Sequence, residues 1–233
     1  MANTPVVVLD DTLTNIANAI RGKNGSSDKY KPGQMADAID NISAGGTGIP
    51  REVIDGGYKL PEVTSFSLPS NATDVGPNAL AYAFYSCPSL TSVDLSSLTK
   101  VSGESAFYEA FYNCTALTSV DLSSLTTLSV RNALASAFDS CTALTSVDFS
   151  SLTTVSGYHS LYGTFSRCSS LTSLSFPALT LSGLQFGSDQ FDNMIRGVNG
   201  CTVHFPASVQ SKIETTGSYP NFGGTNTTVL FDL

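Results

Sequence analysis

The chain is poor in charge and contains no tryptophan. Charged residues make up 13% of its 233 residues, against roughly 25% in an average soluble protein. Lysine and arginine total 11 and the acidic residues 19, so the formal net charge is −8 at pH 7. Phosphate neutralisation by basic side chains dominates nucleic-acid affinity. The composition therefore predicts no nucleic-acid partner.

Long apolar runs and an export signal are also missing. No stretch approaches the roughly 18 apolar residues that make a membrane-spanning helix. Residues 1–10 lack the basic region, the long apolar region and the cleavage site of a secretory signal. The sequence therefore predicts no membrane insertion and a protein that is made and left in a cytoplasm.

Catalytic and metal-binding motifs are absent as well. The sequence has no phosphate-binding loop, no nucleophile elbow, no H-E-x-x-H and no C-x-x-C pair. Cys201 and His204 are three residues apart, which places them on opposite faces of a strand. We therefore expect neither an enzyme nor a cofactor.

What the chain does have is a repeat of 27 residues. Leu90, Leu117 and Leu144 each begin the pattern Leu-Thr-Ser-Val-Asp, and Leu171 begins a looser copy. Two columns keep the same step: Phe84, Phe111, Phe138 and Phe165, and Cys87, Cys114, Cys141 and Cys168. This period lies in the range of leucine-rich repeats, whose strands carry the pattern L-x-x-L-x-L.

The repeat predicts a fold because strand side chains alternate between two faces. The Leu, Val and Leu of each copy point inward, and stacked copies bury a continuous core that one copy cannot form alone. We predict an α/β repeat solenoid over residues 60–200, with short strands on the concave side and short helices opposite. Residues 201–233 are expected to form a C-terminal cap of two strands around an amphipathic segment with Val209 and Ile213.

The cysteine column is expected to be structural. Equal spacing stacks one cysteine per turn, where a free thiol behaves as a small buried apolar group. The odd total of five and the missing export signal argue against a disulfide framework.

The repeat pattern Ala-Phe-x-x-Cys-x-x-Leu-Thr-Ser-Val resembles the BspA-type leucine-rich repeats of bacterial surface proteins and of phages that infect gut Gram-positive bacteria. The resemblance covers roughly residues 60–205. It implies a general binding scaffold and does not specify a ligand.

Residues 1–45 carry no repeat and predict a small helical hairpin, followed by a linker and N-terminal cap over residues 46–59. Each predicted helix has one apolar stripe for docking or assembly, formed by Leu13, Ile16 and Ile20 and by Met35, Ile39 and Ile42. Residues 11–42 resemble an N-terminal module of phage minor structural and tail proteins. That resemblance implies tethering to other tail proteins, and a homo-oligomer.

The strand positions suggest one candidate recognition surface. Three aspartates recur at 27-residue steps beside exposed serines: Asp94, Asp121 and Asp148, with Ser92, Ser119 and Ser146. Like charges on neighbouring strands are expected to raise a carboxylate pKa. Either these carboxylates bond to local backbone groups, or the array binds sugar hydroxyls or a cation, with calcium as the metal hypothesis.

The segments opposite the strands suggest a second candidate surface. Tyr85 and Tyr112 share a column, and Tyr158 and His159 lie where the repeats differ from one another. Variable loops on a rigid scaffold are typical contact positions, and tyrosine is common at interfaces. Half-buried packing beside the phenylalanines is the other interpretation.

These features favour a non-enzymatic phage virion protein of the tail or baseplate, assembled in the host cytoplasm. Its hairpin would bind other tail proteins and its solenoid would recognise or adhere to a host-surface glycan or protein. The alternatives are a BspA-like adhesin on the bacterial cell surface and a purely structural tail component. A solenoid that binds ice or a mineral is the least favoured of these functions, because the outward residues read Ser-Asp-Ser and do not form a flat Thr-x-Thr array.

Overall fold

A computed structural model describes residues 64–68, 70, 72–180, 190–211 and 222–233. The expected N-terminal hairpin and linker, with assembly residues Leu13, Ile16, Ile20, Met35, Ile39 and Ile42, lie outside the described residues. They stay predictions.

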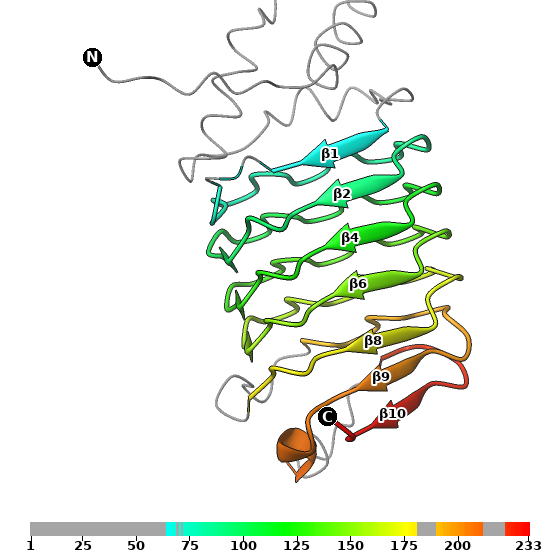
Figure 1. The fold of residues 1–233 in the computed structure, drawn as a ribbon. Coiled ribbons are helices and arrows are strands. Elements are labelled where there is room, and N and C mark those ends of the chain that lie inside the picture. The colour runs from blue at the N-terminus through cyan, green and yellow to red at the C-terminus, as the bar shows by residue number, and fades with distance from the viewer. Residues whose placement is uncertain (1–63, 69, 71, 181–189, 212–221) are drawn as a thin grey trace, which may run out of the picture.

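The described residues form a stack of parallel strands, one per turn of the chain (Figure 1). Strands β1 (Ser65–Ser67), β2 (Ser92–Asp94), β4 (Ser119–Asp121) and β6 (Ser146–Asp148) pair in that order. Every residue in this ladder lies opposite the one 27 positions further along, as Val93 does to Val120. The predicted solenoid with its 27-residue period is therefore confirmed.

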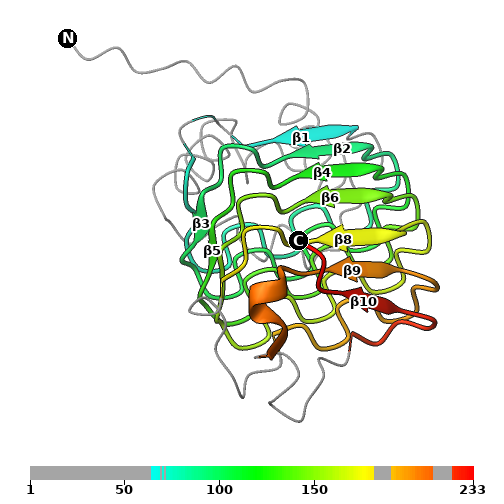
Figure 2. The same cartoon turned by 60° about the horizontal axis from the view of Figure 1, so that its bottom comes forward.

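Two further ladders complete the stack, and the turned view shows one of them at its side (Figure 2). Strands β8 (Ser173–Ser175), β9 (Thr202–His204) and β10 (Thr228–Leu230) continue the stack after β6. The short strands β3 (Lys100–Val101), β5 (Thr127–Leu128) and β7 (Thr154–Val155) form the lateral ladder. The two C-terminal strands expected beyond residue 200 are present and extend the parallel stack.

The core lies inside the coil and follows the predicted alternation. In β2, β4 and β6 the central valine is buried, and the flanking serine and aspartate are exposed. The leucines before and after each strand, such as Leu117 and Leu122, are fully buried. Four phenylalanines stack in parallel down the core, with centroids 5.3, 5.2 and 5.8 Å apart: Phe84, Phe111, Phe138 and Phe165.

The predicted helices opposite the strands are wrong. Residues 76–86, 103–113, 130–140 and 157–167, here called the turn segments, are runs of tight turns. Every fourth residue has a positive φ, as at Asn78 (54°), Tyr82 (60°) and Ser86 (56°). Helical structure in the described part of the chain is confined to residues 207–211, where η1 (Ala207–Val209) buries Val209.

Backbone hydrogen bonds explain why no α-helix forms there. In the first turn segment, the N–H groups of Leu80 and Phe84 donate to the next turn, at Ala106 and Ala110. The N–H of the intervening Ala83 donates three residues back, to Leu80. In an α-helix each N–H donates to the carbonyl four residues back. Here the N–H groups of Leu80 and Phe84 donate to the neighbouring turn, so they are not available for helical hydrogen bonds.

The cysteines form the expected buried column. All five are free and buried: Cys87, Cys114, Cys141, Cys168 and Cys201. The thiol of Cys141 donates to the carbonyl of Phe111 at 3.1 Å, and Cys114 and Cys168 make the equivalent bonds. Burial raises the pKa of Cys168 to about 12 and that of Cys201 to about 11. The thiols of Cys168 and Cys201 are therefore protonated packing groups.

A search of the described residues for a helix long and apolar enough to cross a bilayer found none.

Candidate functional site

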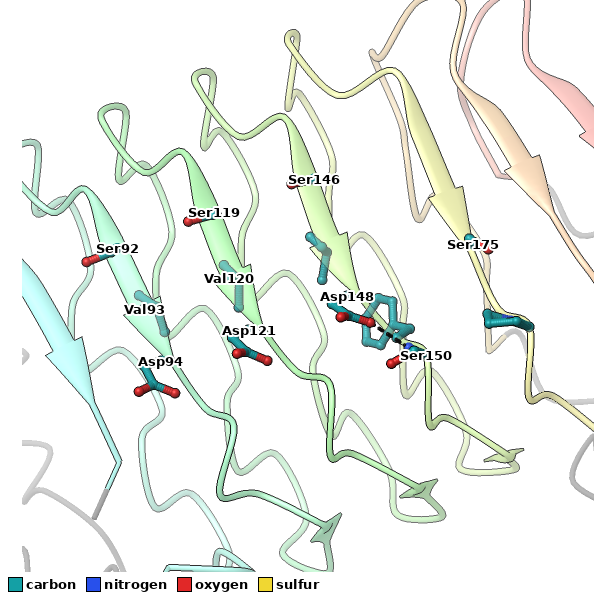
Figure 3. Close-up of a pocket in the computed structure, with 13 residues that line it drawn as sticks. Ser92, Val93, Asp94, Ser119, Val120, Asp121, Ser146, Asp148, Ser150 and Ser175 are labelled. Atoms are coloured by element: carbon teal, nitrogen blue, oxygen red, sulfur yellow. Dashed lines mark hydrogen bonds between the residues drawn. The ribbon is translucent and has the colours of Figure 1, made fainter. Parts of the chain in front are cut away.

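The outward side of β2, β4 and β6, here called the strand face, carries the first predicted surface. Its serines and aspartates line a shallow depression of about 570 Å³ (Figure 3). The depression extends to Ser150, Ser175 and Pro177 at its C-terminal end. The structure thus brings together all six predicted polar residues of this surface: Ser92, Asp94, Ser119, Asp121, Ser146 and Asp148.

Each of the three aspartates caps the backbone two residues further on. Asp121 Oδ1 accepts the N–H of Ser123 at 2.9 Å, and Asp94 and Asp148 accept from Ser96 and Ser150 in the same way. The contacts bear out the expected bonding to local backbone groups, and recognition by the same surface stays a prediction. The second oxygen of Asp94 also accepts the hydroxyl of Ser67 at 3.1 Å.

The pKa of Asp94 corrects one expectation. Hydrogen bonds from the side chain and backbone of Ser96, and from Ser67, lower this pKa below its usual value and outweigh burial. The expected rise of the pKa through like-charge repulsion is therefore wrong for Asp94, because hydrogen bonds to the charged carboxylate lower its pKa.

The described residues give no support to the calcium hypothesis, which stays a prediction. Among the described residues, no group of three or more His, Cys, Asp or Glu side chains is placed to hold a metal ion. Calcium needs six to eight oxygens converging on one point. The ladder instead spaces its carboxylates one strand apart, and each is held to its own turn.

The second predicted surface lies on the turn segments, across the core from the strand face. All six tyrosines of the described residues belong to these segments. Four of them form what we call the tyrosine ridge: Tyr82, Tyr85, Tyr108 and Tyr112. Tyr85 and Tyr112 stack at 4.7 Å and 9°, and Tyr108 meets Tyr82 edge-on at 5.5 Å. Burial raises the pKa of Tyr108 to about 12.

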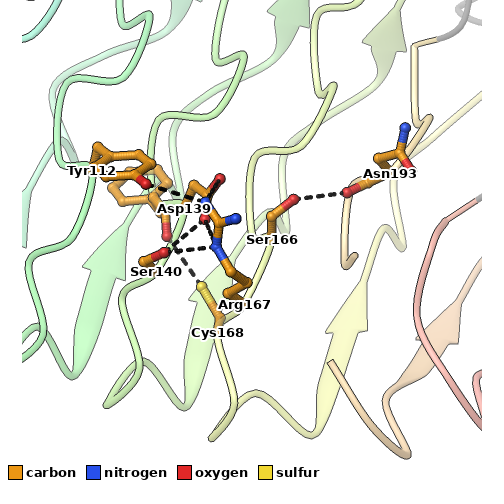
Figure 4. Close-up of polar contacts among 8 residues, drawn as sticks. Tyr112, Asp139, Ser140, Ser166, Arg167, Cys168 and Asn193 are labelled. Carbon is orange, nitrogen blue, oxygen red and sulfur yellow. Dashed lines mark hydrogen bonds and ion pairs between the residues drawn. The ribbon is translucent and has the colours of Figure 1, made fainter. Parts of the chain in front are cut away.

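An ion pair that sequence reasoning missed holds the end of this ridge (Figure 4). The guanidinium of Arg167 donates to both carboxylate oxygens of Asp139, at 3.0 and 2.8 Å. It also donates to Ser140 and to the hydroxyl of Tyr112, and lies 5.9 Å from that ring's centre. The divergence of Asp139 and Arg167 from the residues 27 positions earlier was the available signal.

Tyr158 and His159 lie in the last turn segment, residues 157–167, where they contact each other and are not part of the tyrosine ridge. Their rings stack at 3.8 Å, and Tyr162 lies 4.6 Å from the imidazole. Arg131 lies over Tyr158, which is 42% exposed. The structure therefore places the four predicted aromatic residues on one side of the solenoid but in two groups.

A known repeat family matches most of the solenoid. The family described as BspA type leucine rich repeat region matches residues 81–212 in 6 copies. A leucine-rich repeat protein from Bacteroides ovatus ATCC 8483, known from a crystal structure, is 16% identical with a TM-score of 0.28. The alignment covers 62% of this chain, which spans only 52% of that protein. No curated protein matches the chain.

Proposed function

Because the chain belongs to the BspA-type leucine-rich repeat family, we propose that it serves recognition or adhesion, as a non-enzymatic phage virion protein. In this proposal the solenoid projects from the tail or baseplate and meets the host surface. The bacterial cell-surface adhesin and the purely structural tail component are the alternatives that the experiments below separate.

The observation that carries the proposal is the depression on the strand face. Its walls are exposed hydroxyls and carboxylates held in register by the ladder of β2, β4 and β6. The carboxylates are fixed by their backbone contacts, so a ligand would bind without first ordering them. A preorganised surface loses less entropy on binding, which favours recognition by many weak polar contacts.

The virion part of the proposal rests on the N-terminal sequence. Residues 11–42 resemble an assembly module of phage tail proteins, and such proteins are usually homo-oligomers. Its partners would be other tail proteins, reached through the apolar stripes of residues 13–20 and 35–42. Light scattering of the full chain tests this part, since a monomer at micromolar concentration contradicts self-assembly.

A cell-binding assay with the full chain tests recognition. Ser119→Arg puts a bulky side chain into the depression, whereas Thr115→Arg introduces the same side chain at an exposed position outside it. We expect the first variant to lower binding to host cells about tenfold, the equivalent of about 1.4 kcal/mol, and the second to bind like the parent. Equal binding by both variants would reject the strand face as the contact surface.

Labelling with antibodies separates the alternatives. Gold particles on phage tails, together with blocked adsorption, support the virion receptor-binding role. Labelled tails with unaffected adsorption favour the structural component. Label on the bacterial envelope in uninfected cells favours the adhesin.

A further inference from the structure

We propose that the tyrosine ridge is a second contact surface and that its ligand is an uncharged carbohydrate. The inference rests on the proposed recognition of a host surface, because it names one class of molecule recognised there. It also assigns the contact to the side of the solenoid opposite the strand face.

The fold does not require tyrosine at these positions. Counting in steps of 27, Tyr85 and Tyr112 align with Asp139 and Ser166, and Tyr108 aligns with Ala81, Ala135 and Tyr162. One buried position of the same turn segments, by contrast, keeps phenylalanine in all four turns: Phe84, Phe111, Phe138 and Phe165. Packing therefore fixes the phenylalanine position. The tyrosine positions accept other residues in later turns, where the smaller side chains of Ala135, Asp139 and Ser166 are buried.

The ridge is held rigid from one end. The stack of Tyr85 on Tyr112 continues to the guanidinium of Arg167, which the buried carboxylate of Asp139 fixes in a two-bond contact. Asp139 is only 8% exposed, so its carboxylate is shielded from solvent, while the side chain of Arg167 is 51% exposed. Rings that are already ordered lose little entropy when a ligand covers them.

The charges of the ridge favour a neutral ligand. Two acidic groups, Glu109 and Asp139, are balanced by Arg167 and Arg196, which both interact with Asp139. Glu109 bonds to the side chain of Tyr108. With no excess of either sign, the ridge gives no electrostatic attraction to a phosphate-rich or strongly anionic polymer.

The size of the ridge favours a sugar over a protein. Tyr85 is 38% exposed, and the other three rings are half-buried. A stable protein interface covers about 800 Å² on each partner, which is far more than these partly covered rings present. A sugar ring combines apolar C–H faces with hydroxyls, and aromatic faces edged by a few polar groups form the usual lining of small-ligand sites.

Tyrosine fluorescence of the full chain reports such binding directly, because the protein has no tryptophan. The probes are tetramers of glucose and of N-acetylglucosamine. We expect saturable quenching by at least one of them. The double variant Tyr85→Ser/Tyr112→Ser adopts the residue found at the equivalent Ser166, and we expect it to bind about tenfold more weakly. Thermal unfolding verifies that it folds.

The matched control is Leu230→Ser, which removes an equally exposed apolar side chain on β10, outside the ridge. We expect it to retain parental affinity. Equal affinity of the double variant and the parent overturns the ridge as the site. If host cells bind the parent while neither tetramer does, the carbohydrate inference fails and the proposed function stands. Loss of cell binding after protease treatment of the cells likewise overturns the carbohydrate in favour of a protein. If the cells do not bind at all, the proposed function fails.

Discussion

Threonine hydroxyls join successive turns at the residue scale. Thr126 donates to the carbonyl of Thr99 at 2.8 Å, and Thr153 donates to the carbonyl of Thr126 at 3.1 Å. On the other side of the leucine pattern, Thr118 and Thr145 make equivalent bonds. The chain has 34 serines and 25 threonines. Hydroxyl groups such as those of these threonines donate hydrogen bonds from one turn to the preceding turn and so hold the solenoid together.

Acid should weaken the protein partly through Asp94. Its pKa is lowered in the folded state, so its contribution to stability is present above the unfolded pKa. That contribution is lost as the pH falls through the folded value. Asp94→Asn keeps an oxygen for the N–H of Ser96 but does not titrate. We expect its free energy of unfolding, from urea titrations, to fall less than the parent's between about pH 5 and pH 3.

Asp94→Ala separates the hydrogen bond from the charge. Without an acceptor for the Ser96 N–H, this variant should be about 1 kcal/mol less stable than Asp94→Asn at neutral pH. If the parent and Asp94→Asn lose stability in parallel on acidification, the lowered pKa does not contribute.

The phenylalanine column is the main packing device at the element scale. Phe111 is fully buried and stacks between Phe84 at 5.3 Å and Phe138 at 5.2 Å. The planes of Phe111 and Phe138 differ by only 2°. Each turn segment therefore contributes one ring to a continuous stack, and the loss of one ring leaves a gap that both neighbouring turns border.

Phe111→Ala should cost about 3–5 kcal/mol of stability, the usual range for removing a fully buried phenylalanine. Chemical denaturation monitored by circular dichroism measures this loss. Phe231→Ala is the control, because Phe231 is only partly buried and contacts Phe205, outside the phenylalanine column. A loss of equal size at both positions would show that the column does not act as a packed stack.

The turn segments show where sequence reasoning stops at this scale. An amphipathic helix and a run of tight turns both place Ala110 and Phe111 inward, so the apolar pattern fits either. The choice depends on the N–H of Phe111, which donates to Ala137 in the next turn. That partner is 26 residues away, and a local pattern cannot reveal it.

The whole molecule should tolerate the loss of one complete turn. Most contacts of a turn are with its two neighbours, although Arg167 also reaches Tyr112 two turns away, so stability is approximately a sum over turns and interfaces. Deletion of residues 117–143 joins Ala116 to Leu144 and restores an unbroken Cys-Thr-Ala-Leu-Thr-Ser-Val pattern. We expect this variant to fold cooperatively, with a strand spectrum like the parent's and a lower denaturation midpoint.

Deletion of residues 117–130 is the control for register. It removes about half a period and would bring inward and outward positions into the same column, so we expect an unfolded or aggregated chain. Failure of the complete-turn deletion to fold, with the control failing equally, would contradict the additive stack.

The strand face and the tyrosine ridge differ in how far the sequence could locate them. The recurrence of Ser-Val-Asp at a fixed step was enough to align Asp94, Asp121 and Asp148 on exposed strand positions, where the structure has them. The Arg167–Asp139 pair does not recur at 27-residue steps, so the repeat does not predict it. It joins two residues from adjacent turns that occur once each, and only the coiled chain brings them to 2.8 Å.

The sequence by itself determined the period, the residues that face inward and the burial of the cysteines, because each follows from a pattern repeated at a fixed step. Only the tertiary structure decided that the segments opposite the strands are turns, that hydrogen bonds lower the pKa of Asp94, and that Arg167 holds the end of the tyrosine ridge. The turns and the contacts of Arg167 depend on donors and acceptors that the stacking of one turn on the next brings together. The pKa of Asp94 depends on the local backbone conformation that directs the donors of Ser96 at its carboxylate.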